Sequence, residues 1–172
     1  MIVTLVPYSQ CDFSFFNRAS SFNQPLSSWK TSSATDLSRM FRLAVRFNSD
    51  ISTWDVSNVL DLSFAFRDAF SFNSSIADWS VSRVLDFNHM FQDARSFDQN
   101  IGSWQMQSAL NVSGMFFGAT NFRNSLCGWG SSLPSGIGPS ELSNMFANTA
   151  CPSQASPDLA ESPPGPFCHV CE

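Results

Sequence analysis

Residues 41–65 read FRLAVRFNSDISTWDVSNVLDLSFA, and this pattern returns every 25 residues along most of the 172-residue chain. All five tryptophans and two columns of phenylalanines fall on that period. The members are Trp29, Trp54, Trp79, Trp104 and Trp129; Phe16, Phe41, Phe66, Phe91 and Phe116; and Phe22, Phe47, Phe72, Phe97 and Phe122. Such a period predicts a solenoid, in which each unit buries its apolar face only by stacking on the next.

A short helix and a short strand are predicted in each repeat. Positions 37, 40, 41 and 44 are apolar, which is the i, i+3, i+4, i+7 stripe of a helix. Segment 51–56 is extended in character and bounded by polar residues, which favours a strand. The expected fold is therefore an α/β repeat solenoid, a leucine-rich-repeat-like right-handed coil with one short parallel strand and one short helix per repeat. The residues placed to cap the helices are Asp36, Asp61, Asp86 and Asn111.

The repeat divides the chain into three parts. Residues 1–15 read as a degenerate repeat, because Asp12-Phe-Ser-Phe-Phe16 matches Asp36-Leu-Ser-Arg-Met-Phe41 with one residue missing. Residues 16–151 form the predicted solenoid, with an insertion near residues 130–140 that is rich in Gly, Pro and Ser. Residues 152–172 are predicted to be a Pro-rich, Cys-containing cap tail, because prolines prevent further repeats.

Two columns are expected to hold neighbouring repeats together. The tryptophan column is interpreted as core, because all five copies keep it; a row of exposed stacking platforms for sugar rings is the alternative. A polar column is expected to bond turn amides between coils. Its members are Asn23, Asn48, Asn73, Asp98 and Arg123.

Composition narrows the classes of partner. Charged residues make up 13% of the chain, the net charge is -5 and Lys30 is the sole lysine, so the sequence offers no basic stripe for phosphates or anionic lipid. No apolar run approaches the roughly 20 residues of a spanning helix. We therefore expect neither nucleic-acid binding nor membrane insertion by this segment. The first residues lack the pattern of a signal peptide, and Met1 is treated as an arbitrary start.

One unit carries a family resemblance. Phe47-Asn-Ser-Asp-Ile-Ser-Thr-Trp-Asp-Val-Ser-Asn-Val59, followed by Asp61-Leu-Ser and an Ala/Met-Phe pair, closely resembles the BspA-like surface repeat, also described as the mycoplasma lipoprotein-associated repeat of unknown function. The match covers roughly residues 12–151. It implies a leucine-rich-repeat-like solenoid in secreted or surface-anchored proteins, with adhesion or recognition as its function. It supplies no catalytic residues, and Ala65 departs from it where Met is usual.

Four of the five cysteines lie in the last 46 residues, which predicts a cross-linked cap. Cys127 and Cys151 are expected to meet across neighbouring coils. Cys168 and Cys171 are expected to form structural disulfides, with each other or with other cysteines; half of a zinc site and free thiols are the alternatives. The odd cysteine is then Cys11, whose partner would lie outside this chain.

The sequence shows no pattern that is typical of catalysis. No serine, cysteine or carboxylate has a plausible catalytic partner, so we expect no enzymatic activity, no cofactor and no metal. His89 is interpreted as a surface histidine. The Asp and Asn residues before each predicted helix are interpreted as caps rather than as a calcium ladder, because the glycine-rich spacing of calcium-binding repeats is absent.

Two polar columns beside the predicted strand form the candidate binding face. Their side chains differ between repeats while staying hydrophilic, as on a recognition surface; a merely solvated face is the alternative. We expect a non-catalytic extracellular or cell-surface module for adhesion or for protein or glycan recognition, with a rigid spacer or assembly subunit of a surface layer or filament as the alternative. The candidate residues are Ser28, Thr53, Asp78 and Ser103 in one column and Asp55, Ser80 and Gln105 in the other.

Overall fold

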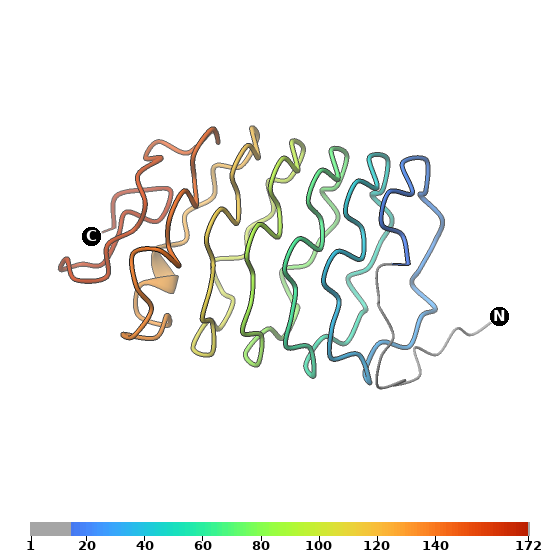
Figure 1. The fold of residues 1–172 in the computed structure, drawn as a ribbon, viewed down its shortest axis with the longest axis horizontal. Helices are drawn as coiled ribbons and strands as arrows, with labels where there is room; N and C mark the ends of the chain where they lie inside the picture. The colour runs from blue at the N-terminus through green and yellow to red at the C-terminus, as the bar shows by residue number, and fades with distance from the viewer. Residues whose placement is uncertain (1–14, 172) are drawn as a thin grey trace.

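The computed structural model describes residues 15–171, which form a row of stacked coils (Figure 1). Successive coils lie side by side along the long axis, from the blue coil at one end to the red tail at the other. The coils are built almost entirely of turns and irregular chain. Within residues 15–171 one helical segment occurs, the 3-10 helix η1 at Cys127–Trp129. The expected N-terminal remnant falls almost wholly outside the described residues, and so does Cys11.

The predicted α/β architecture is wrong. Across residues 15–171 there is neither an α-helix nor a β-strand, and neighbouring repeats share only isolated parallel bridges. The leucine-rich-repeat-like coil with one strand and one helix per repeat is therefore replaced by a stack of turns. The bridges are Asp36↔Asp61, Asp61↔Asp86 and Asp86↔Asn111.

The predicted helix is a ladder of alternating turns, here called the turn ladder (residues 37–44 and their equivalents). In residues 37–44 the amides at even positions bond within the coil, as from Met40 to the carbonyl of Leu37 at 3.3 Å. The amides at the odd positions between them bond to the next coil, as from Phe41 to the carbonyl of Ala65 at 2.8 Å, and the equivalent amides do the same in the following coils. An α-helix directs every interior amide to the carbonyl four residues earlier. Because half of these amides bond to the neighbouring coil, the stripe stays buried without forming a helix.

Left-handed residues produce this alternation. Arg39 and Leu43 have φ values of 57° and 60°, and the same two positions are left-handed in the following coils. A left-handed residue at every fourth position reverses the chain locally and prevents helix propagation. The later pairs are Phe64 and Asp68, His89 and Asp93, Gly114 and Gly118, and Asn144 and Asn148.

The predicted strand also consists of turns. The amide of Trp54 donates to the carbonyl of Ile51 at 3.1 Å, and that of Val59 donates to Val56 at 2.9 Å. The Asp50 and Asp55 carboxylates accept bonds from the amides two residues later, at 2.9 and 3.0 Å. Such Asx bonds start turns and use the amides that a strand would direct to its neighbour.

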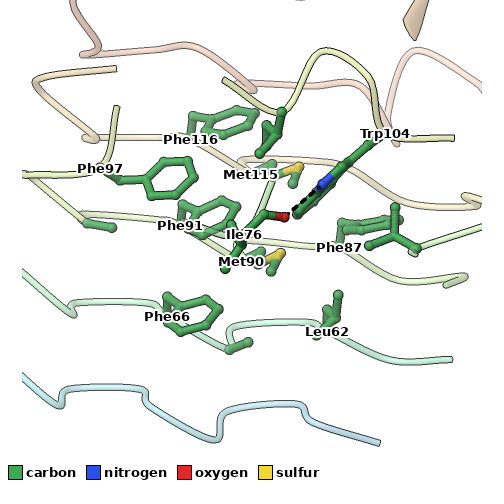
Figure 2. Packing of buried hydrophobic residues seen from close by; sticks show 14 of the residues in the cluster. Leu62, Phe66, Ile76, Phe87, Met90, Phe91, Phe97, Trp104, Met115 and Phe116 are labelled. Atoms are coloured by element: carbon green, nitrogen blue, oxygen red, sulfur yellow. Dashed lines mark hydrogen bonds between the residues drawn. The ribbon is translucent and has the colours of Figure 1, made fainter. Parts of the chain in front are cut away.

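The core is a continuous aromatic stack (Figure 2). Phe66 packs on Phe91 in the next coil at 5.6 Å between ring centroids, and Phe91 packs on Phe116 at 5.6 Å. Within a coil the two phenylalanine columns meet, as in the stack of Phe91 on Phe97 at 3.9 Å. Each coil thus buries its rings against both neighbours, which makes stability a property of the stack rather than of one repeat.

The polar column forms the expected inter-coil ladder. The Asn23 side-chain oxygen accepts the amide of Asn48 at 2.8 Å, and Asn48 accepts that of Asn73 at 2.7 Å. The series continues through Asp98, which accepts the amide of Arg123 at 3.2 Å. This prediction is confirmed.

The C-terminal end is closed by the tail. Phe167 is fully buried, and its carbonyl accepts the amide of Leu126 at 3.1 Å. The insertion near residues 130–140 adds a buried side chain, Leu133, whose amide donates to the Trp129 carbonyl. The tail lies against this last coil, since Gly130 approaches both Pro164 and Phe167.

Candidate recognition surface

The two predicted polar columns lie at turns and reach solvent. All seven candidate side chains are exposed. The candidate residues flank the tryptophan column, so the buried indoles fix the backbone to which these polar side chains are attached. The candidates are Ser28, Thr53, Asp78, Ser103, Asp55, Ser80 and Gln105.

Few of these side chains are engaged by the fold. Thr53 donates to the Ser27 carbonyl at 3.4 Å, and Gln105 donates to the Ser103 carbonyl at 3.2 Å. Asp55 is the most constrained, because it accepts bonds from the Ser57 hydroxyl at 2.6 Å and from the Ser57 amide. The hydroxyl bond, followed by the amide bond, holds the pKa of Asp55 below its ordinary value. The columns therefore present polar groups and the Asp55 carboxylate to solvent.

The tryptophan column faces inward. Trp54, Trp79, Trp104 and Trp129 are at most 4% exposed, whereas Trp29, in the first described coil, is half-buried. In each of those four, the indole N–H donates to a carbonyl of the preceding coil at 3.1–3.2 Å, as Trp104 does to Ile76 in Figure 2. Buried rings whose N–H groups are already bonded offer no platform to a sugar.

The Asp and Asn column starts turns instead of capping helices. Asp61 accepts the amide of Ser63 at 2.7 Å, and Asp86 accepts that of Asn88 at 2.7 Å. Burial raises the pKa of the Asp86 carboxyl, and the nearby Asp61 carboxylate adds to that rise, against the lowering effect of the Asn88 amide. Among residues 15–171 no group of three or more His, Cys, Asp or Glu side chains is placed to hold a metal ion.

The four C-terminal cysteines form two disulfides, but not the expected pairing. Cys127 bonds to Cys171 and Cys151 bonds to Cys168. The predicted Cys127–Cys151 bridge is wrong because the tail folds back over the last coil and brings Cys168 and Cys171 to these two positions. Disulfides are typical of proteins that mature outside the reducing cytosol.

Sequence reasoning missed a second polar face, on the turn ladder of the first coils. Arg39 and Arg67 both lie over the ring of Phe64, at 5.2 and 5.6 Å from its centroid. The His89 ring stacks on the same phenylalanine at 5.4 Å. Arg67 also pairs with Asp68 at 3.4 Å. The available signal was the excess of arginine in the first two repeats, which the low overall charge concealed.

His89 is half-buried rather than fully exposed. Its Nδ1 atom is buried without a hydrogen-bond partner. Burial and then the positive charge of Arg67 lower the pKa of His89, against the opposing effects of the Gly114 backbone and the Asp86 carboxylate. The imidazole therefore favours its neutral form.

Comparison with known families agrees with the repeat pattern. The model of the family described as "Mycoplasma protein of unknown function, DUF285" matches residues 12–129 and 49–155. The chain belongs to this family. The family match does not confirm the narrower BspA-like and leucine-rich-repeat assignment. No curated protein and no solved structure matches the chain. Over residues 15–171, none of the helical structure is long and apolar enough to cross a membrane.

Proposed function

We propose that this protein is a non-catalytic extracellular or cell-surface repeat module for adhesion, which recognises a protein or a glycan. The observation that carries the proposal is the pair of polar columns, whose side chains change from coil to coil on a backbone that does not change. Thr53, Asp78 and Ser103 occupy equivalent exposed positions with three different side chains.

The fold supports this role through rigidity. The buried indole behind each polar position is bonded to the preceding coil, as in the 3.2 Å bond from Trp79 to the Ile51 carbonyl. A partner that binds such a surface orders little additional backbone, which lowers the entropic cost of binding. The two disulfides support an oxidising location outside the cell.

A binding screen tests the proposal. The full chain is measured against arrays of glycans and of surface and matrix proteins. The variant Thr53→Ala/Asp78→Ala/Gln105→Ala is expected to lose binding to any partner that the wild type selects. The matched control, Ser71→Ala/Thr120→Ala/Asn121→Ala, changes three exposed polar residues of other columns and should keep it. A wild type that selects no partner would refute the proposal.

The alternative, a rigid spacer or assembly subunit, gives a different result in solution. It predicts concentration-dependent assembly of the chain without any ligand. Sedimentation velocity measures this directly. A monomer that binds a glycan or a matrix protein counts against the alternative.

A further inference from the structure

The positive charge of this acidic chain is concentrated at one end. Residues 15–49 contain five cations, Arg18, Lys30, Arg39, Arg42 and Arg46, against one carboxylate, Asp36, a net charge of +4. The whole chain has a net charge of -5. A local field of opposite sign to the rest of the protein attracts anions to that end.

Four arginines occupy neighbouring positions of the turn ladder, and they are here called the arginine patch (Arg18, Arg39, Arg42 and Arg67). Arg42 and Arg67 occupy equivalent positions in adjacent coils, and the amide of Leu43 bonds to the Arg67 carbonyl at 2.8 Å. The Arg18 amide bonds to the Arg42 carbonyl at 2.7 Å. Arg39 and Arg67 share the Phe64 ring. The patch thus crosses three successive coils.

Most of this charge is not neutralised within the described part of the chain. Arg67 pairs with Asp68, whereas Arg18, Arg39 and Arg42 have no ion pair among residues 15–171. Arg18 and Arg39 are exposed, and Arg42 is half-buried. Contact with the Phe64 face restrains the guanidiniums of Arg39 and Arg67, so less side-chain freedom is lost when they bind an anion.

We propose that the arginine patch binds the sulfate and carboxylate groups of an acidic, sulfated glycan. This inference rests on the proposed recognition function and names the ligand chemistry. Guanidinium groups bind such anions through two parallel hydrogen bonds, which ammonium groups do not provide. A row of guanidiniums on adjacent coils suits a linear polymer with charges at regular intervals.

Other linear partners fit this face less well. An extended acidic peptide gains much of its affinity by pairing its main chain with free amides and carbonyls. Here the amides of Phe41 and Leu43 are already bonded to the next coil. Nucleic acid needs a longer basic track, whereas the rest of this chain is acidic and carries disulfides typical of an extracellular protein.

The test uses the full chain and heparin as the probe, at about 50 mM salt, with neutral dextran as the uncharged control. The patch variant is Arg39→Gln/Arg42→Gln/Arg67→Gln. The control variant, Arg83→Gln/Arg95→Gln/Arg123→Gln, removes the same charge from other columns. We expect the patch variant to lose roughly tenfold or more in affinity, the control variant to lose less than about threefold, and wild-type binding to weaken steeply with salt.

Several results would overturn the inference. Equal losses in the two variants would show a general charge effect, and duplex DNA that competes as well as heparin would show that sulfated glycan is not preferred. Self-association that disappears in the patch variant would assign the patch to a second copy of the chain. Wild-type protein that ignores heparin but binds another partner refutes this inference alone, whereas protein that binds nothing refutes the proposed function as well. Melting curves verify folding, and the single variants Arg39→Gln and Arg42→Gln repeat the test if the patch variant unfolds.

Discussion

The middle coils and the C-terminal cap belong to the same aromatic stack but are stabilised by different interactions. In the middle coils, residues 37–122, equivalent atoms repeat the same bonds from coil to coil, and the structure places no cross-link there. In the cap, residues 126–171, the bonds are irregular and two disulfides hold the tail over the last coil. The contrast indicates that the regular coils are held by their neighbours on both sides, whereas the irregular C-terminal cap is also held by covalent bonds.

The largest expected effect is the removal of an aromatic residue from a middle coil. Trp79→Ala should lower the free energy of unfolding by about 3 to 5 kcal/mol, because a buried ring and its bond to Ile51 are both lost. Urea denaturation measures the change. Trp29→Ala, at a half-buried position, should lower the free energy of unfolding by a clearly smaller amount. If Trp79→Ala kept its melting temperature and lost ligand binding, the core interpretation of this column would be wrong.

Opening the cap should have a smaller and more local effect. Cys127→Ala/Cys171→Ala removes the closure of a loop with a sequence separation of 44 and should destabilise the protein by about 2 to 4 kcal/mol. Limited proteolysis should cut the tail first, while hydrogen exchange in the middle coils stays slow. Simultaneous loss of protection in both regions would show that the cap and the coils unfold as one unit.

A glycine substitution probes the fit between coils. A Cβ atom on Gly114 would lie 2.3 Å from Nδ1 of His89, so Gly114→Ala should reduce the free energy of unfolding by about 1 to 3 kcal/mol. The positive φ of Gly114 adds backbone strain to this clash, although His89 adopts the same conformation at the equivalent position. Gly136→Ala, in the insertion, meets nothing within 4 Å and serves as the control. A double-mutant cycle with His89→Ala should recover part of the loss; additive losses would exclude the steric explanation.

The smallest expected effect concerns the Asp column. The pKa of Asp86 is raised by burial, so the folded state binds its proton more tightly than the unfolded chain does. Ionised Asp86 therefore destabilises the fold, and this effect disappears as the pH falls through its folded-state pKa. Asp86→Asn should raise the free energy of unfolding at pH 7 by up to about 0.5 kcal/mol, with a difference that vanishes in acid. Asn111 already fills the equivalent position and accepts the amide of Ser113 at 3.0 Å. A difference that grows in acid would contradict this account.

The repeat and the burial pattern were predictable, because the residues that recur every 25 positions are Trp and Phe, which strongly favour the core. The backbone conformation could not be predicted in the same way. Positions 37, 40, 41 and 44 are buried whether they lie on a helix or on alternating turns, so burial spacing does not separate the two. The column Asp68, Asp93, Gly118 and Asn148 held the missing signal, since Asp, Asn and Gly are the residues most often found in the left-handed region.

The recognition surface was predictable only in part. The exposure of Asp78 and Gln105 follows from their polar, variable columns. The cysteine pairing depended on the path of the tail, which irregular Pro-rich sequence does not specify. The arginine patch needed the register of the turn ladder, since only that register brings Arg39 and Arg67 to one phenylalanine ring.

The insertion near residues 130–140 shows how the stack of coils tolerates a longer repeat. The Phe91 amide bonds to Met115, 24 residues ahead, whereas the Phe116 amide bonds to Met145, 29 ahead. Phe146 nevertheless packs on Phe116 at 5.7 Å, in the same column as before. The five added residues are accommodated in a loop, and the aromatic column keeps its register. We therefore expect the equivalent turn in the other coils to accept an inserted loop. Chains of this kind can then differ in their surface loops while they keep the same core.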